Sequence, residues 1–319
     1  MAKSSKVSVV GAGGNVGSIV AYSVAMQGLA HEVVLVDRDK DRAQGKALDM
    51  NQAAAALRTH SIVRAAKDYN DIAGSKVVVI TAGFPRKPGM SRDDLLFANA
   101  DIVSEVVENI KKHAPDSIII VVTNPLDTMT YVALKKSGFP KNRVIGMAGI
   151  LDGARMTHFI YEKLKFGAGQ IRATVIGGHG DYMVPLPRYS TVAGIPITDL
   201  LTPDELHEVV ENTKNGGAQI VKLMGTSAYF APGKATAIMV EAILKDSKKI
   251  YPCSTMLEGE YGVNGIPNGV PVTLGENGVE EIIELQLTPK EREMFDRSVA
   301  SVKELIDVLE AKNYFGDKK

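Results

Sequence analysis

The sequence holds one cysteine, no net charge and no apolar run of membrane length. Its single cysteine, Cys253, excludes an internal disulfide framework and is typical of a reducing compartment. Lysine plus arginine number 37, as do aspartate plus glutamate, which argues against a nucleic-acid partner because such proteins carry a basic excess. No stretch approaches the roughly 20 apolar residues of a membrane span. We therefore expect a cytoplasmic protein with neither a nucleic-acid nor a membrane partner.

One stretch that is low in charge resembles a secretion signal, but its glycines argue against that interpretation. No lysine, arginine, aspartate or glutamate occurs between Lys6 and Glu32. A signal peptide needs a continuous apolar helix, whereas the glycines between positions 11 and 17 favour a turn. The composition, 45% hydrophobic and 23% charged, is that of a globular protein of one large or two ordinary domains.

Short β-branched runs alternate with helical patterns over the first 150 residues. One helix is predicted over Arg92–His113 and a shorter one over Ser18–Gly28. The predicted strands are Lys6–Val10, Glu32–Val36, Lys76–Thr81, Ser117–Val122 and Arg143–Met147, with a weaker one near Ile62. The run Val77–Ile80 is apolar at every position, as is typical of strands that a parallel sheet buries on both faces.

The pattern changes after about residue 148. A helix over Gly153–Lys165 and a strand over Ala173–Ile176 come first. Thr202 and Thr288 each begin a capping box, and Asn277-Gly278 predicts a hairpin turn between two apolar runs. We therefore predict an α/β fold: a doubly wound parallel sheet in a first domain, residues 1–147, followed by an α+β domain, residues 148–319.

A glycine-rich segment lies between the first predicted strand and helix. Gly11, Gly14 and Gly17 are spaced three apart, and Asp37 follows the second strand 20 residues after Gly17. Glycines at such a turn let a dinucleotide pyrophosphate approach the backbone, and a carboxylate after the second strand binds a ribose 2′-hydroxyl and repels a 2′-phosphate. The alternative is a purely structural turn. The combination favours a dinucleotide site for NAD over NADP.

Two arginines lie on the loop after the strand Lys76–Thr81, at the edge where open α/β sheets bind ligands. We expect Ser91 to cap the next helix, which places Arg92 in the first turn, where a cation opposes the helix dipole. Arg86 and Arg92 together suggest anion capture. The alternative is a pair of solvated surface arginines.

A histidine in the second half lies between glycines, in the segment Gly177–Asp181. Glycine neighbours leave the imidazole of His179 open to a ligand, although a structural histidine is an equal alternative. Asp152 and Arg155 stand three residues apart on a predicted helix and share a face. They are either part of a site or a local ion pair, or Asp152 is the N-cap of the helix. Asn124 follows the strand Ser117–Val122, where a turn is the default interpretation.

Taken together, these segments resemble the lactate/malate dehydrogenase family from about Val7 to the C-terminal helix. The matching segments are Gly11–Gly17, Thr81–Gly83 with the loop as far as Arg92, Thr123–Asp127, Leu151–Arg155 and Gly177–Asp181. The resemblance implies a Rossmann-type first domain that binds NAD and a homodimer or homotetramer. It also implies a set of cofactor-binding residues: Gly11, Gly14, Asn15, Val16, Gly17, Asp37, Thr81, Gly83, Asn99 and Asn124. No metal is implied.

The resemblance also implies roles for the charged residues. His179 would act as the general acid and base, Asp152 would orient the imidazole, and Arg155 would bind the C1 carboxylate of the substrate through a bidentate pair. Arg92 would polarise the substrate carbonyl. Asn124 and Ser227 would complete the substrate pocket.

Arg86 bears on the choice of substrate. Members of the family that act on lactate usually carry an uncharged residue at this loop position, whereas arginine would pair with a second carboxylate. We therefore expect the reversible oxidation of (S)-malate to oxaloacetate by hydride transfer. Lys234 and Thr226 depart from the family pattern, and both lie at the far wall of the expected pocket.

Three alternatives remain. The first is a dehydrogenase for L-lactate or another 2-hydroxyacid. The second is an NAD-dependent glycoside hydrolase, which would need a metal held by residues such as cysteine and histidine, and Cys253 has no histidine close in sequence. The third is a non-catalytic NAD-sensing protein, which would not need His179, Asp152 and Arg155 together.

Overall fold

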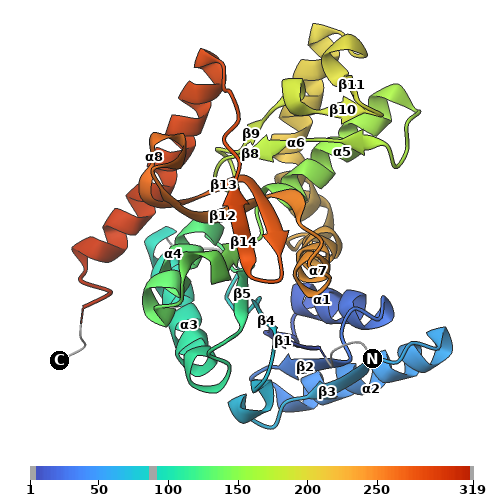
Figure 1. Ribbon diagram of the computed structural model, residues 1–319, viewed down its shortest axis with the longest axis vertical. Coiled ribbons are helices and arrows are strands. Elements are labelled where there is room, and N and C mark those ends of the chain that lie inside the picture. Colours follow the sequence, from blue (N-terminus) through green and yellow to red (C-terminus); the bar gives the residue numbers. More distant parts are fainter. Residues whose placement is uncertain (1–4, 86–91, 317–319) are drawn as a thin grey trace.

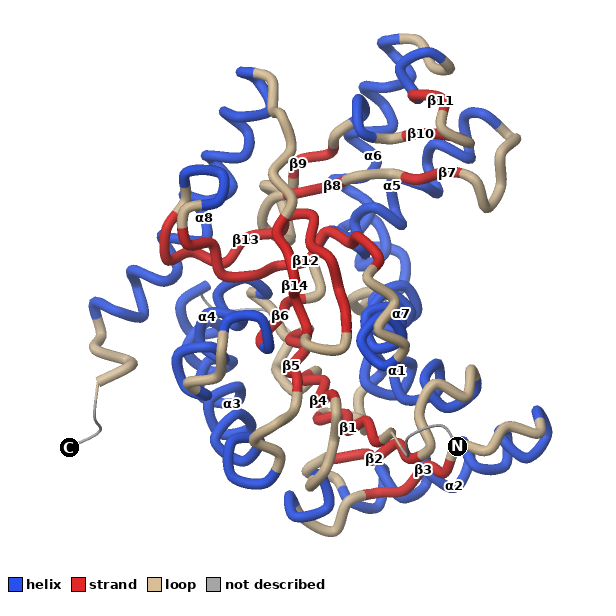
Figure 2. Tube along the Cα trace, in the orientation of Figure 1, coloured by secondary structure: helices blue, strands red, loops and turns tan. Residues whose placement is uncertain are grey.

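A nine-stranded mixed sheet runs through the centre of the protein (Figures 1 and 2). The computed structural model describes residues 5–85 and 92–316, with the side chain of Arg92 excluded. The strand order is β14-β13-β12-β6-β5-β4-β1-β2-β3. Six parallel strands form its core: β1 (Lys6–Val10), β2 (Glu32–Val36), β3 (Ile62–Ala65), β4 (Val77–Ile80), β5 (Ile118–Val121) and β6 (Val144–Gly146). The predicted parallel sheet is confirmed.

The central parallel strands β4 and β5 are buried at every position, as their unbroken apolar sequence predicts. Alternate side chains of one strand belong to two separate hydrophobic cores: Val77 and Val79 of β4 lie in one, and Val78 and Ile80 in the other. All four are fully buried. A strand that faces solvent on one side would need polar residues at every second position, and β4 and β5 have none.

Helices cover both faces of the sheet. The first core is closed by α1 (Asn15–Met26), α2 (Lys40–Leu57) and α7 (Phe230–Leu244), and α1 packs against α7. The second core is closed by α3 (Arg92–His113), α4 (Leu126–Ser137) and α8 (Pro289–Ala311). In Figure 1, α3 and α4 lie on one side of the strands, and α1 and α7 lie on the other.

The second half of the chain extends this sheet and adds a third, smaller core. Strands β12 (Lys249–Glu258), β13 (Asn264–Gly275) and β14 (Gly278–Ile282) continue the sheet antiparallel, joined at one residue pair between β12 and β6. Helices α5 (Gly149–Leu164) and α6 (Pro203–Met224) enclose the third core. With them lie β7 (Ile171–Arg172), β8 (Val175–Ile176), β9 (Val184–Pro185), β10 (Thr191–Val192) and β11 (Ile195–Pro196). Single 3₁₀ turns are η1 (Tyr69–Ile72), η2 (Lys141–Arg143), η3 (Pro187–Tyr189), η4 (Ile197–Asp199) and η5 (Glu260–Gly262).

Local sequence features locate several boundaries correctly. Thr202 and Thr288 form complete capping boxes with the glutamates three residues on, at the starts of α6 and α8. Gly278 has φ +92°, a conformation that glycine adopts without strain, and it closes the predicted hairpin between β13 and β14. Two helices begin earlier than predicted: α1 starts at Asn15 instead of Ser18, and α5 starts at Gly149 instead of Gly153.

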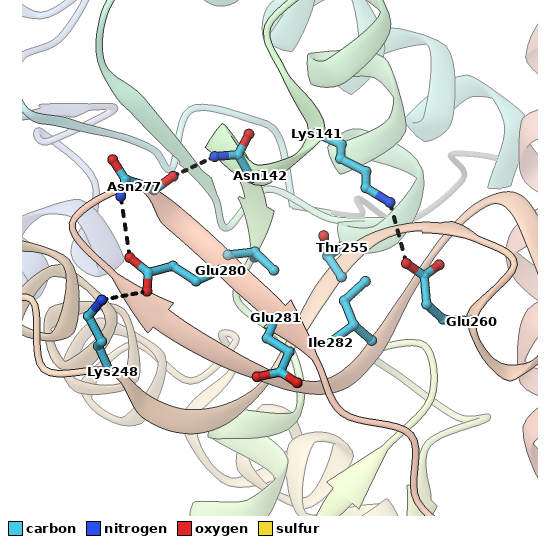
Figure 3. Close-up of a pocket in the computed structure, with 10 residues that line it drawn as sticks. Lys141, Asn142, Lys248, Thr255, Glu260, Asn277, Glu280, Glu281 and Ile282 are labelled. Atoms are coloured by element: carbon cyan, nitrogen blue, oxygen red, sulfur yellow. Dashed lines mark hydrogen bonds and ion pairs between the residues drawn. The ribbon is translucent and has the colours of Figure 1, made fainter.

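A polar cavity of about 560 Å³ lies where the β13–β14 hairpin meets η2 (Figure 3). Lys141 forms an ion pair with Glu260, and Lys248 forms one with Glu280 at 3.1 Å. Because both lysines already face carboxylates, this cavity offers no uncompensated cation to an anionic substrate. It lies apart from the predicted site residues.

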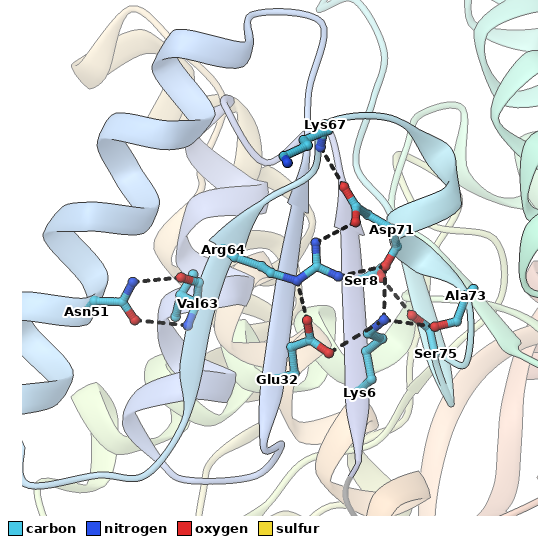
Figure 4. Close-up of polar contacts among 10 residues, drawn as sticks. All are labelled: Lys6, Ser8, Glu32, Asn51, Val63, Arg64, Lys67, Asp71, Ala73 and Ser75. Atoms are coloured by element: carbon cyan, nitrogen blue, oxygen red, sulfur yellow. Dashed lines mark hydrogen bonds and ion pairs between the residues drawn. The ribbon is translucent and has the colours of Figure 1, made fainter.

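Ion pairs fix the outer edge of the parallel sheet (Figure 4). Arg64 of β3 pairs with Glu32 of β2 and, at 2.9 Å, with Asp71 of η1, while Lys6 of β1 donates to the Ala73 carbonyl at 2.8 Å. Half-exposed pairs of this kind contribute at most about 1 kcal/mol each. They hold η1 over the ends of β1 and β2.

Among the described residues, no helix is long and apolar enough to cross a membrane.

Candidate active site

The glycine segment forms a tight turn between β1 and α1. Gly11 has φ +86°, and a Cβ atom there would lie 2.6 Å from the Ala82 nitrogen. A Cβ atom on Gly17 would lie 2.6 Å from the Gly11 carbonyl oxygen. Both positions therefore require glycine, because the backbone of the β4 loop and the start of α1 approach so closely. The first turn of α1 carries no acidic residue and Gly14 offers no side-chain cap, so the free N–H groups there suit a phosphate.

Asp37 stands at the end of β2 and contacts the glycine turn directly. Its Oδ2 accepts a hydrogen bond from the Gly13 N–H at 2.7 Å, and its Oδ1 accepts one from the Asp39 N–H at 3.0 Å. A Cβ atom on Gly13 would lie 2.7 Å from this carboxylate, so a side chain there would displace Asp37, and Gly13 joins Gly11 and Gly17 as a constrained position that the spacing argument did not single out.

A cavity of about 490 Å³ opens beside this turn, between the ends of β1, β2 and β4. Five predicted cofactor residues line it together: Gly11, Gly14, Asp37, Thr81 and Gly83. The rest of its wall includes apolar side chains such as Val36, Ala66 and Ile102. The apolar part of the wall fits an adenine ring and the Asp37 carboxylate fits ribose hydroxyls, so the residues present suit a bound dinucleotide.

Lys46 of α2 forms hydrogen bonds with the glycine turn, a contact that the sequence did not predict. Its ammonium donates to the Gly13 carbonyl at 2.8 Å, to the Gly14 carbonyl at 3.4 Å and to the Ser18 hydroxyl. Partial burial and the charge of Arg42 lower the pKa of Lys46. Lys46 thus binds the carbonyl groups of Gly13 and Gly14. Because the C=O and N–H groups of a peptide point in opposite directions, the N–H groups of the same two peptides point away from Lys46.

Asn99 lies inside α3 and connects two predicted site segments. It is buried, its Oδ1 accepts from the Phe84 N–H at 2.7 Å, and its Nδ2 donates to the Asn124 carbonyl at 2.7 Å. Asn124 precedes Pro125, the N-cap of α4, through a cis peptide bond. Asn99 therefore fixes the main chain at the ends of β4 and β5.

His179, Asp152 and Arg155 meet in one hydrogen-bonded row. The Nδ1 atom of His179 lies 2.8 Å from Asp152 Oδ2, and Nη1 of Arg155 donates to Asp152 Oδ1 at 3.0 Å. Asp152 is 1% exposed and lies in the first turn of α5, so it is not the N-cap of that helix. The helix pair Asp152 and Arg155 and the histidine of a separate loop therefore form a single cluster.

The electrostatics of this row favour a protonated imidazole. Burial lowers the pKa of His179, but the charge of Asp152 and its hydrogen bond outweigh burial, so the pKa is raised above its ordinary value. The positive charge of Arg155 acts in the other direction and lowers the pKa of His179, without reversing the rise. The Nε atom of Arg155 is buried and has no hydrogen-bond partner within residues 5–85 and 92–316, which leaves it for a ligand.

The other predicted substrate residues are less well placed. Arg86 and Ser91 lie outside the described residues, and of Arg92 only its position as the first residue of α3 is described. Ser227 lies in the exposed connection between α6 and α7. Lys234, which departs from the family pattern, donates to Gln27 at the end of α1 at 2.8 Å and so forms no part of the cluster around His179.

Comparison with known proteins assigns both halves of the chain. Residues 5–146 match the model of the lactate/malate dehydrogenase NAD binding domain, and residues 150–313 match that of the lactate/malate dehydrogenase alpha/beta C-terminal domain. A malate dehydrogenase of Nitratiruptor sp. is 93% identical over 318 residues, covering 100% of both chains. One from Sulfurimonas denitrificans is 60% identical, covering 100% of this chain and 99% of its own.

Solved structures of two kinds share this fold. The malate dehydrogenase of Salinibacter ruber is 48% identical with a TM-score of 0.93, covering 98% of this chain and 100% of its own. A lactate dehydrogenase of Cryptosporidium parvum, complexed with lactic acid and nicotinamide adenine dinucleotide, is 41% identical with a TM-score of 0.92, covering 97% and 99%. The overall fold therefore does not distinguish the two substrates.

Proposed function

Since the chain belongs to the lactate/malate dehydrogenase family, we propose that His179 is the general acid and base of its reaction and that Asp152 orients it. The activity is that of an NAD-dependent malate dehydrogenase, which converts malate reversibly to oxaloacetate. The predicted family, the Rossmann-type fold with its second α/β domain, and NAD as cofactor are confirmed.

The row of three side chains supports this role for His179. NAD, when bound, exchanges a hydride with C2 of the substrate. Because Nδ1 of His179 lies 2.8 Å from Asp152, its Nε2 is the ring nitrogen left to face a substrate oxygen. His179 donates a proton to the carbonyl oxygen of oxaloacetate and takes it back from the hydroxyl group of malate. Asp152 holds the Nδ1–H tautomer and stabilises the imidazolium.

Arginines supply the counter-charges for a dianionic substrate. We propose that Arg155 binds the C1 carboxylate, since its Nε is buried with no hydrogen-bond partner in the described chain. Arg92 would polarise the carbonyl, and Arg86 would pair with the second carboxylate, as the sequence suggests. Asn124 and Ser227 would complete the pocket. Lactate has no second carboxylate, so a lactate dehydrogenase would leave Arg86 without an anionic partner.

The pH dependence of catalysis tests the role of His179. Reduction of oxaloacetate needs protonated His179, so kcat/KM for reduction is expected to fall tenfold per pH unit above the His179 pKa. That pKa is raised, so the fall begins above the ordinary value of about 6.5. Oxidation of malate needs neutral His179, so its kcat/KM rises with pH over the same range. Absorbance of the nicotinamide follows both directions. Profiles of the same sign in both directions would contradict the proposal.

The remaining predicted cofactor contacts follow from the geometry of the turn. We propose that Asn15, Val16 and Gly17 present N–H groups at the start of α1 to the pyrophosphate, with Gly11 and Gly14 allowing close approach. Thr81 holds the turn by donating to the Val10 carbonyl at 2.9 Å. Gly83 lines the same cavity, where a Cβ atom would lie 2.5 Å from Thr123. Asn99 and Asn124 would act from the edge of this cavity.

Asp37 is expected to exclude NADP. In Asp37→Ser, kcat/KM with NADPH should rise at least about tenfold relative to that with NADH, because the carboxylate no longer repels a 2′-phosphate. The KM for NADH should rise as well, since Gly13 loses its acceptor. Asp39→Ser is the matched control: Asp39 is an exposed N-cap two residues away, and its loss should leave the cofactor preference unchanged. An unaltered ratio in Asp37→Ser would refute this role.

We propose further that residues 1–147 form the cofactor domain and residues 148–319 the substrate domain, because the chain passes from β6 into α5 at this point. A homodimer or homotetramer is supported by exposed apolar side chains on three helices. They are Leu48 and Leu57 of α2, Val221, Leu223 and Met224 of α6, and Phe230 of α7. A reducing, cytoplasmic location is supported by the lone cysteine, a buried free thiol.

A further inference from the structure

A second buried carboxylate lies directly behind His179. Asp127, in the first turn of α4, is 4% exposed. Its Oδ2 accepts a hydrogen bond from the His179 N–H at 2.8 Å, and its Oδ1 accepts one from the Ser254 hydroxyl at 2.6 Å. Asp127 thus connects α4, the histidine loop and β12 through one side chain.

The main chain before His179 is fixed at two further points. The Gly178 N–H donates to the Ser298 hydroxyl of α8 at 2.6 Å, and the Gly177 N–H donates to the Gly269 carbonyl of β13 at 2.7 Å. Three successive N–H groups are therefore held by three different elements. A Cβ atom on Gly178 would lie 3.3 Å from Asp127 Oδ2, so a larger residue there would crowd the carboxylate.

The hydrogen bonds around Asp127 fit an ionised carboxylate. Each of its two oxygens accepts a hydrogen bond from a donor, as an acceptor-only carboxylate does. Burial raises the pKa of Asp127 above its ordinary value, and the hydrogen bonds from Ser254 and from the His179 N–H offset only part of this rise.

The three charges that act on the imidazole, those of Asp152, Arg155 and Asp127, sum to zero with a protonated His179, whereas Asp181 is exposed and lies outside this set. Asp127 and Asp152 contribute two negative charges, and Arg155 with protonated His179 contributes two positive ones. Asp181 and Tyr182 flank the histidine in its own loop. Ser254 of β12 contacts Asp127, Ser298 of α8 contacts the Gly178 peptide of this loop, and both residues are uncharged. Loss of the Asp127 charge would leave the imidazolium with less compensation.

We propose that Asp127 is a positioning residue whose carboxylate fixes the main chain of His179 and compensates the charge of its imidazolium. The proposal rests on the proposed role of His179 as the general acid and base. Asp127 does not touch the substrate, and it acts through the His179 peptide and through its electric field. A purely structural anchor would hold the loop equally well but would not alter the proton affinity of the imidazole.

The substitution Asp127→Asn separates these two roles. An asparagine can accept from the His179 N–H through Oδ1 and donate to the Ser254 hydroxyl through Nδ2, so both contacts can persist without the charge. The pH at which kcat/KM for oxaloacetate reduction begins to fall should drop by about half to one unit, because one nearby negative charge is lost. At alkaline pH, a shift of this size lowers kcat/KM of the variant by a factor of about three to ten relative to the parent enzyme.

Ser298→Ala is the matched control, because it removes an anchor of the adjacent Gly178 peptide and leaves every charge in place. Its pH profile should keep the parent midpoint, even if kcat falls. Retained NADH binding shows that both variants are folded. Should Asp127→Asn not fold, Ser254→Ala provides the second test: it weakens the ionised form of Asp127 and should move the midpoint in the same direction by less.

The outcomes separate the two proposals. A lowered midpoint in Asp127→Asn with an unmoved midpoint in Ser298→Ala supports the role of Asp127. An unmoved midpoint in both Asp127→Asn and Ser254→Ala, or equal shifts in Asp127→Asn and Ser298→Ala, would overturn it. A parent enzyme whose reduction rate shows no alkaline fall would instead overturn the role of His179, whatever the Asp127 variants do.

Discussion

Replacement of His179 by asparagine is expected to lower kcat for oxaloacetate reduction by about two to four orders of magnitude, the usual contribution of a positioned general acid. Asparagine can still hydrogen-bond to Asp152, but it cannot deliver a proton to the oxygen that becomes charged when the hydride arrives. The dissociation constant for NADH, measured by fluorescence, should stay within about twofold, because the cavity beside the glycine turn does not include His179.

His158 provides the control for this experiment. It lies on α5, its side chain is 62% exposed, and it faces Glu162 at 3.6 Å on the helix surface. The substitution His158→Asn should leave kcat and KM unchanged. If His179→Asn turns over oxaloacetate at a near-normal rate, the general acid lies elsewhere and the role assigned to the row with Asp152 and Arg155 is wrong.

The sequence predicts the parallel sheet well because its evidence is local. The central strands β4 and β5 are short runs of β-branched residues, and burial on both faces leaves no polar position to obscure the pattern. The capping boxes at Thr202 and Thr288 are equally local, since each is closed within three residues. The helices α2 and α7 were not predicted because small residues such as Ala43 and Ala235 form much of their buried faces and give a weak apolar periodicity.

The parts of the site that the sequence missed are long-range contacts. Lys46 reaches the Gly13 carbonyl across 33 residues, and Asp127 reaches the His179 N–H across 52. Neither residue type nor spacing shows that these side chains bond to a particular peptide group. His179, Asp152 and Arg155 could be selected because each has an unusual local setting, but only the fold shows that they form one hydrogen-bonded row.

The substitution Arg86→Gln is expected to reverse the preference between the two substrates that the family uses. Arg86 lies outside the described residues, so this prediction rests on its position in the sequence and on charge. Oxaloacetate carries a second carboxylate that a guanidinium pairs with, whereas pyruvate ends in a methyl group. Loss of one side of a desolvated charge pair costs several kcal/mol, and about 4 kcal/mol corresponds to a thousandfold change. The ratio of kcat/KM for oxaloacetate to that for pyruvate should therefore fall by about a thousandfold or more.

The direction of each individual constant makes this prediction specific. In Arg86→Gln, kcat/KM should fall for oxaloacetate, because its second carboxylate loses the guanidinium. It should rise for pyruvate, because no unpaired cation then lies beside the pyruvate methyl group. Lys87→Gln, which removes the neighbouring charge, is the control and should change both substrates by a similar small factor. A general loss of activity toward both substrates in Arg86→Gln would show that the arginine supports catalysis without selecting the substrate. In that case the preference for malate would have to come from another part of the pocket.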